Sequence, residues 1–230
     1  MEGPAVPLPS ARNRGMSMVF CRVREGSSIR GYNRLMSFLA PATLTGPRIT
    51  LEPLSPRHRD DLAEAVAEGR LWDTWYTSIP SPEGMADEID RRLALRAEGQ
   101  MMPWAVIDTL SGRAVGMTSF YNPQEQHRRV EVGYTWLGKA AQGVGINPEA
   151  KLLILTHAFE TCGALSVVLM THWHNHQSRA AIARLGAKQD GVLRNHQVWR
   201  DGTLRDTVLF SIISSEWPAV KSGLRARLRG

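Results

Sequence analysis

The chain has 230 residues, of which 43% are hydrophobic and 22% are charged, a composition that suits a soluble globular protein with one sizeable α/β domain. No apolar run approaches the roughly 18–20 residues that a membrane helix needs, so we expect no membrane partner. The formal net charge is +6, yet residues 49–218 carry 17 arginine and lysine residues against 20 aspartate and glutamate residues. Because nucleic-acid binding needs basic charge on the folded domain, we expect no nucleic-acid partner.

The two ends of the chain hold the excess basic charge. Residues 1–43 contain three prolines in the first nine positions, six arginines and little apolar periodicity. A transit peptide and sequence upstream of a true start at Met36 both stay open for this segment. We predict a flexible basic extension over residues 1–43, one folded domain over 44–218 and a basic tail over 219–230.

Neither Cys21 nor Cys162 lies in a metal-binding or redox spacing. This usage suits a reducing compartment, so we expect a cytoplasmic protein without disulfides. We expect Cys162 to close a helix as a small buried residue.

The first regular elements of the chain are predicted to be a strand and two helices. Alternating apolar residues predict a strand over 49–54. Ser55-Pro56 then begins a helix, because serine caps helices and proline suits their first position. Ser81-Pro82 begins a second helix in the same way, after an aromatic-rich connection over residues 71–80.

The remaining elements alternate between strands and helices. We predict strands over 104–107, 114–120, 130–137, 166–171 and 206–213, helices over 148–161 and 177–185, and a hairpin turn at Asp201-Gly202. This mixed order predicts one α/β sheet domain without internal repeats.

A glycine-containing loop, Gln142-Gly-Val-Gly-Ile-Asn147, connects the strand over 130–137 to the next helix. Glycines let successive backbone N–H groups face one point, and a helix N-terminus adds partial positive charge. We expect Asn147 to cap this helix, with Pro148 in its first position. The segment suits a pyrophosphate and matches neither a dinucleotide fingerprint nor a P-loop. Taken alone, it fits a tight strand-to-helix turn equally well.

A second strand–loop–helix unit follows, with Asn175 at the strand exit and Ser178 in the first turn of an amphipathic helix that Gly186 ends. The two units, in this order and spacing, resemble the GNAT superfamily, and specifically its RimJ/RimL-type N-acetyltransferase branch. The resemblance covers about residues 44–217.

The superfamily's Q/R-x-x-G-x-G/A element aligns with Gln142 to Asn147, and the branch's N-x-x-S…L-G-F element aligns with Asn175 to Ala187. Two positions depart from these patterns. Asn147 stands where glycine or alanine is usual, and Ala187 replaces an aromatic residue. Neither departure removes a group to which the resemblance assigns chemistry.

The resemblance implies an α/β GNAT fold, with a mixed, mostly antiparallel central sheet of about six to seven strands and about four flanking helices. It also implies an enzyme that moves an acetyl group from acetyl-CoA directly to an amine, without a metal. The strands over 130–137 and 166–171 would splay apart to admit the pantetheine arm. Backbone N–H groups of the first of these strands would polarise the thioester carbonyl.

Carried over residue by residue, the resemblance gives Glu131, directly or through water, the role of accepting the amine proton. Ser178 would protonate the departing thiolate and Asn175 would orient the cofactor. The expected cofactor-binding residues are Trp136, Leu137, Gln142, Gly143, Val144, Gly145, Ile146, Asn147, Asn175 and Ser178. Two plainer interpretations stay open: Glu131 as an ordinary outward strand residue, and Ser178 as a hydroxyl at a helix start.

The aromatic connection holds Trp72, Trp75 and Tyr76, which either belong to the core or line the acceptor pocket that the family builds there. Three histidines, His172, His174 and His176, occupy every second position, as metal ligands on a strand sometimes do. No carboxylate or cysteine is nearby to complete a set of ligands, so we expect no metal. A role for His174 in proton transfer stays open.

The acceptor amine is not identified by these motifs. A protein N-terminus, a polyamine, an aminoglycoside and a small metabolite all fit, as does an acyl group other than acetyl. The mild negative charge of residues 49–218 suits a cationic amine. A non-catalytic CoA-binding or ribosome-associated protein is the alternative function, and whether two copies form a homodimer stays open.

Overall fold

The computed structural model describes residues 35–229. The expectations for Cys21 and for residues 1–34 of the basic extension lie outside this part of the chain. Within it, no helix combines the length and the apolar composition that crossing a bilayer requires.

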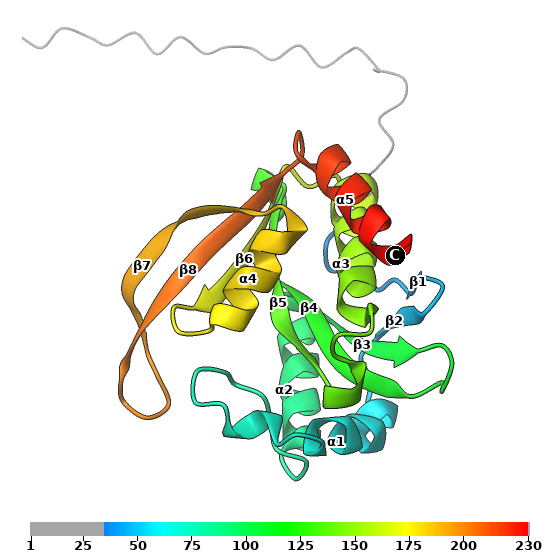
Figure 1. Cartoon of the computed structure of the whole chain (residues 1–230), viewed down its shortest axis with the longest axis vertical. Helices are drawn as coiled ribbons and strands as arrows, with labels where there is room; N and C mark the ends of the chain where they lie inside the picture. The colour runs from blue at the N-terminus through cyan, green and yellow to red at the C-terminus, as the bar shows by residue number, and fades with distance from the viewer. Residues whose placement is uncertain (1–34, 230) are drawn as a thin grey trace, which may run out of the picture. The chain divides into compact units, whose positions relative to one another are not determined.

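A single eight-stranded sheet runs through the described residues in the order β1-β2-β3-β4-β5-β6-β8-β7 (Figure 1). The strands are β1 (Leu44–Thr45), β2 (Ile49–Pro53), β3 (Met101–Asp108), β4 (Ala114–Gln124), β5 (Arg129–Leu137), β6 (Ser166–His172), β7 (Lys188–Val198) and β8 (Leu204–Ile213). Neighbouring strands are antiparallel except β5 and β6, which are parallel. The prediction of a mixed, mostly antiparallel sheet is confirmed.

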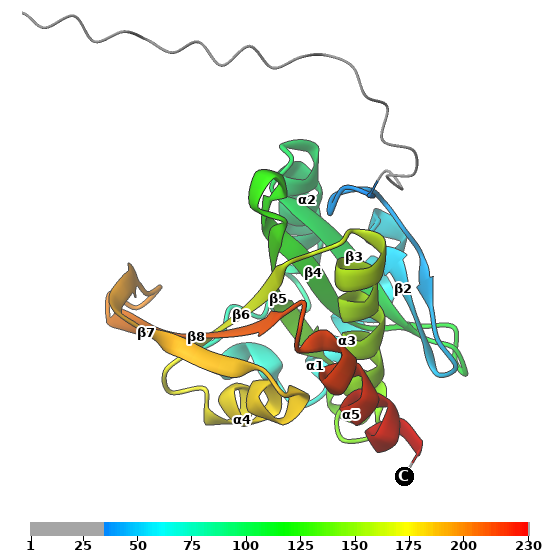
Figure 2. The ribbon, with the colours of Figure 1, turned by 90° about the horizontal axis from the view of Figure 1, so that it is seen from above.

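Helices cover both faces of the sheet, and Figure 2 shows α2 on the opposite side from α3, α4 and α5. The helices are α1 (Arg59–Ala67), α2 (Met85–Ala97), α3 (Ile146–Thr156), α4 (His176–Leu185) and α5 (Trp217–Arg229), and α3 continues into a π-helical turn over His157–Thr161. One apolar cluster joins the sheet to α3, α4 and α5, and a second joins β3, β4 and β5 to α1 and α2.

The folded part extends beyond both boundaries expected from the sequence. The expected boundary at residue 218 falls inside α5, whose residues Trp217, Val220 and Leu224 are buried in the larger cluster. At the other end, Phe38 is buried and its ring lies edge-on to that of Phe120, with centroids 6.0 Å apart. Three apolar positions spaced along a basic helix form a narrow stripe, and composition alone does not reveal it. The short β1 and α5 account for the extra strand and helix.

The two central strands separate after a short paired segment. β5 and β6 pair only at Arg129 with Ser166, Val130 with Val167 and Glu131 with Val168. Beyond these pairs, β5 continues to Leu137 and β6 to His172 without pairing to each other. The expected splay is therefore confirmed. Tyr134, within the unpaired part of β5, has a φ of 49° where the register between β4 and β5 shifts, so a bulge bends this strand.

Candidate active site

The loop between β5 and α3 presents free backbone donors at the start of a helix. Gly143 and Gly145 have φ angles of 79° and 90°, which glycine adopts without strain. No acceptor within residues 35–229 takes a hydrogen bond from the N–H of Gly143, Val144 or Gly145. Because the positive end of the α3 dipole adds to these donors, the loop can bind an anion.

Asn147 does not cap α3, so that prediction is wrong. Gly145 occupies the cap position in a left-handed conformation, which lets the helix begin at Ile146. Asn147 is thus the second residue of the helix and Pro148 the third, where a missing N–H costs no intrahelical bond. The Asn147 Oδ1 atom is buried without a hydrogen-bond partner among the described residues.

Of the other residues expected to bind the cofactor, Gln142 holds the loop in shape. Gln142 donates a 2.9 Å hydrogen bond from Nε2 to the carbonyl of Leu137, which closes the loop onto the end of β5. Trp136 and Leu137 are both buried, Trp136 in the cluster with α1 and α2 and Leu137 in the cluster with α3. Val144 is exposed and Ile146 is buried.

A basic residue that the sequence analysis missed covers this loop. Arg48 donates a 3.0 Å hydrogen bond from Nη1 to the carbonyl of Val144, and a Cβ atom at Gly145 would lie 2.6 Å from the same nitrogen. The buried carboxylate of Glu149 accepts from the Arg48 backbone N–H at 2.9 Å and so ties the start of β2 to the first turn of α3. Nothing in the sequence around Arg48 signals this contact, because it joins segments about a hundred residues apart.

Glu131 lies at the last paired position of β5, where the splay begins. Its side chain is buried, and its Oε1 accepts a 2.6 Å hydrogen bond from Asn122 Nδ2. Tyr121 is opposite it on β4, and burial together with the Glu131 charge raises the pKa of that phenol. A cavity of about 350 Å³ is lined by Tyr121, Asn122 and Tyr134 among others. A carboxylate in this position can accept a proton from a group that lies where β5 and β6 begin to separate.

Asn175 and Ser178 lie at the other end of the splay, beyond the end of β6. Asn175 caps α4, and its Oδ1 accepts a 2.9 Å hydrogen bond from the Ser178 backbone N–H. Within residues 35–229, neither the Asn175 amide nitrogen nor the Ser178 hydroxyl donates a hydrogen bond, so both remain available to a ligand. No hydrogen bond joins this pair to Glu131 in the described part of the chain.

Two of the three aromatic residues expected at the acceptor pocket gather around the end of β6. Trp75 is 46% exposed, and its ring lies edge-on to those of Tyr76 and His172, with centroid distances of 5.4 and 5.2 Å. His174 lies 5.4 Å from the same ring. Trp72 instead packs against the cluster of α1 and α2, so it belongs to the core on this side.

The histidines at the end of β6 contact aromatic rings and each other. His172 and His174 have ring centroids 5.6 Å apart, whereas His176 is exposed at the start of α4. Burial lowers the pKa of His172, and the nearby charges of Arg205 and His174 lower it further. The described residues contain no group of three or more histidine, cysteine, aspartate or glutamate side chains that could hold a metal ion.

The hairpin of β7 and β8, predicted with its turn at Asp201-Gly202, is confirmed, but its contacts with the aromatic connection were not foreseen. The Trp199 indole donates a 2.5 Å hydrogen bond to the carbonyl of Trp75, and its ring centroid lies 5.7 Å from that of His172. Arg200 donates to the carbonyl of Thr74 at 3.1 Å. The two hydrogen bonds join segments more than a hundred residues apart, so local patterns could not reveal them.

Comparison with known proteins identifies this arrangement. A family model described as Acetyltransferase (GNAT) domain matches residues 48–188. The chain belongs to the GNAT acetyltransferase family. It is therefore an acetyl-CoA-dependent N-acetyltransferase, as the two motifs implied.

Individual relatives of this acetyltransferase agree with the assignment. YdaF of Bacillus subtilis (strain 168), a candidate ribosomal N-acetyltransferase, is 32% identical over 177 residues, which are 75% of this chain and 95% of that protein. A GCN5-related N-acetyltransferase from Brucella melitensis superposes with a TM-score of 0.74 at 26% identity, covering 82% of this chain and 86% of its own. Mycobacterium smegmatis RimJ, solved in complex with CoA-disulfide, shares the fold with a TM-score of 0.70 at 22% identity, over 84% of this chain and 97% of its own.

Proposed function

We propose that this acetyltransferase acetylates the α-amine at the N-terminus of a protein, with a ribosomal protein as the kind of acceptor that its relative YdaF suggests. The observation that carries the amine acetylation is the position of Glu131, which is buried where β5 and β6 begin to separate and is hydrogen-bonded to Asn122. The choice of an α-amine as acceptor rests on the likeness to YdaF. The partly exposed surface of Trp75, Tyr76 and Trp199 gives a chain end a surface to lie against.

For the donor, acetyl-CoA supplies the acetyl group as a thioester. The free N–H groups of Gly143, Val144 and Gly145, with the positive end of α3, would hold the pyrophosphate. Arg48 would add positive charge beside them. The unpaired part of β5 leaves backbone N–H groups on the β6 side, which suits an oxyanion hole for the thioester carbonyl.

For the proton transfers, Glu131 would accept the proton that the amine nitrogen loses when it bonds to the carbonyl carbon. Ser178 would give its proton to the thiolate released when the carbon–sulfur bond breaks, and Asn175 would hold the thioester end near that hydroxyl. Asn175 is preorganised for this role because its Oδ1 is fixed by the cap of α4.

Peptides with a free N-terminus test this function. Each peptide would be incubated with the enzyme and acetyl-CoA, and both the released thiol and the acetylated position would be measured. We expect rapid acetylation of the α-amine, and only slow acetylation when the N-terminus is blocked while a lysine side chain stays free. Acetylation of lysine side chains, of polyamines or of aminoglycosides alone would refute the proposed acceptor. CoA binding by calorimetry without thiol release from any amine would favour a non-catalytic protein.

A further inference from the structure

Arg205 of β8 lies on the same face of the sheet as the acceptor surface. In a strand, alternate residues face opposite sides, and Val208 and Phe210 belong to the cluster with α3 and α4. Arg205 and Thr207 therefore face the other side, toward α1 and α2. Thr207 is paired in register with His172 at the end of β6. Arg205 therefore lies beside the aromatic residues that gather there, next to Trp199.

The contacts of Arg205 fix its guanidinium beside Thr207 and Trp199. Its Nε donates a 3.1 Å hydrogen bond to the Thr207 hydroxyl, and its guanidinium carbon lies 4.8 Å from the centre of the Trp199 ring. Burial lowers the pKa of Arg205, and the phenols of Tyr121 and Tyr134 partly offset that effect. Tyr121 thus lies within the electrostatic reach of both Arg205 and Glu131.

Arg205 has no carboxylate partner within residues 35–229. The neighbouring carboxylates are bound elsewhere: Asp206 pairs with Arg194, and Asp201 accepts from Thr203 in the hairpin turn. No carboxylate is among the groups that shift the pKa of Arg205.

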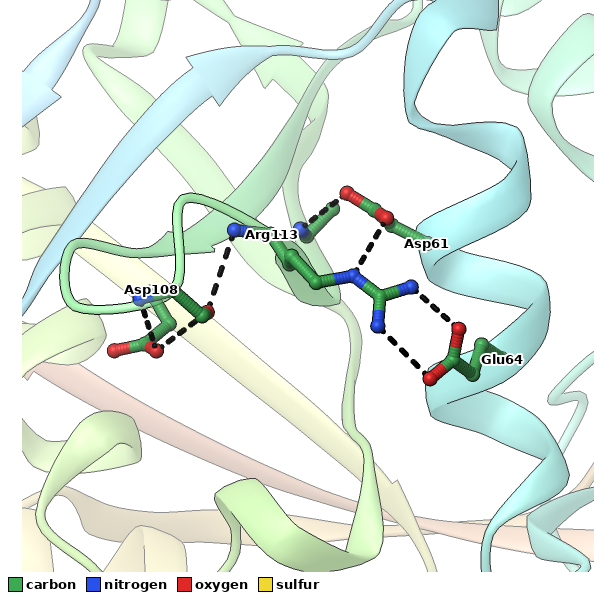
Figure 3. Close-up of polar contacts among 6 residues, drawn as sticks. Asp61, Glu64, Asp108 and Arg113 are labelled. Atoms are coloured by element: carbon green, nitrogen blue, oxygen red, sulfur yellow. Dashed lines mark hydrogen bonds and ion pairs between the residues drawn. The ribbon is translucent and has the colours of Figure 1, made fainter.

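Another arginine of the same sheet shows the contrast. Arg113, at the turn between β3 and β4, pairs with both Asp61 and Glu64 of α1, and the turn itself is held by Asp108 (Figure 3). Its donors are directed to groups of the protein, so its role is structural. The two terminal nitrogens of Arg205 make no hydrogen bond to the described residues. A half-buried guanidinium in this state is suited to a carboxylate from outside the chain, which it can bind with two parallel hydrogen bonds.

We infer that Arg205 binds a carboxylate of the acceptor, so that the preferred substrate is an acidic peptide with aspartate or glutamate among its first residues. This inference rests on the proposed function. It places the amine at Glu131 and the carboxylate at Arg205. The sequence analysis favoured a cationic acceptor from the total charge of residues 49–218, but the groups at the site decide the local field.

Two peptides that differ only in one early residue, aspartate or asparagine, test the inference. Because a hydrogen-bonded charge pair is lost with asparagine, we expect kcat/KM to be about tenfold to a hundredfold higher for the acidic peptide. Arg205→Gln should abolish this ratio, and Arg205→Lys should keep part of it. Arg184 is an exposed arginine on α4, and Arg184→Gln removes the same charge but should leave the ratio unchanged. Thermal melting would establish that each variant folds.

Equal kcat/KM for the two peptides with the unaltered enzyme would overturn the inference, as would a ratio that survives Arg205→Gln. If neither peptide is acetylated, the proposed function fails, and binding to the CoA-loaded enzyme then decides the role of Arg205. Calorimetry should show tighter binding of the acidic peptide to the unaltered enzyme but not to Arg205→Gln. Equal affinities in that experiment would also refute the inference.

Discussion

The Lys151 side chain donates a 3.0 Å hydrogen bond from Nζ to the hydroxyl of Thr135, inside the layer between α3 and β5. Lys151 is buried and forms no salt bridge with the described residues. The Thr135 hydroxyl also lies 2.8 Å from that of Thr118. Lys151 belongs to the second turn of α3, the helix that follows the anion-binding loop. Thr135 belongs to the part of β5 that does not pair with β6.

Replacing Lys151 by methionine should stabilise the protein at neutral pH. Burial lowers the pKa of Lys151 from 10.5 to about 8, so the folded state disfavours the charge that the unfolded chain keeps. The free energy that folding spends on burying the charged Lys151 amine is about 3 kcal/mol below pH 8. This cost disappears as the pH rises from 8 through 10.5. Urea unfolding should therefore show Lys151→Met to be more stable by about 1–3 kcal/mol at pH 7, with a smaller gain at pH 10. A variant that is less stable at pH 7 would contradict this expectation.

Glu131→Gln should slow acetylation of alkylamines more than that of α-amines. The glutamine can still accept the Asn122 hydrogen bond, so the fold should persist. Near pH 7.4 an alkylamine with a pKa near 10.4 is only about one part in a thousand neutral, whereas an α-amine is roughly a quarter to a third neutral. We expect a loss in kcat/KM of about a hundredfold or more on alkylamines and about tenfold or less on α-amines. Equal losses on both would indicate a structural role for Glu131.

Ser178→Ala should lower kcat by about tenfold to a hundredfold, since the departing thiolate loses a positioned proton donor. The Ser178 backbone N–H still bonds to Asn175, so stability should not change. Asn175→Ala is the matched variant and removes the cap of α4, which should cost about 1 kcal/mol of stability. Steady-state assays of thiol release measure the loss of kcat in Ser178→Ala, and urea unfolding measures the loss of stability in Asn175→Ala. Full activity in Ser178→Ala would remove the serine hydroxyl from the mechanism.

Gly145→Glu should weaken acetyl-CoA binding through charge as well as shape. Any side chain at Gly145 meets a φ of 90° and the Arg48 guanidinium, so Gly145→Ala carries the backbone strain, about 1–2 kcal/mol, and the contact with Arg48, but adds no charge. Glutamate adds a carboxylate to the anion-binding loop. Calorimetry should show a larger loss of affinity for Gly145→Glu than for Gly145→Ala. Equal affinities in the two variants would place the pyrophosphate away from this loop.

The sequence alone determined the order of the elements and the two strand–loop–helix units. These follow from local signals: alternation gives the central strands, and the polar segment after the strand over 166–171 places Asn175 at its exit and Ser178 in the first turn of α4, as observed. The family pattern likewise placed Glu131 on β5 and predicted the splay. Such features depend on residues close together in the chain, so they can be recognised before the fold is known.

Only the tertiary structure decided how distant segments meet. The placement of Arg205 and Trp199 beside Trp75 depends on how the β7–β8 hairpin packs across the end of β6. The burial of Lys151 and of Leu224 depends on which side of each helix faces the sheet. A basic residue has the same local signature whether it is solvated or buried, because its energy is set by neighbours that the chain brings together only when it folds.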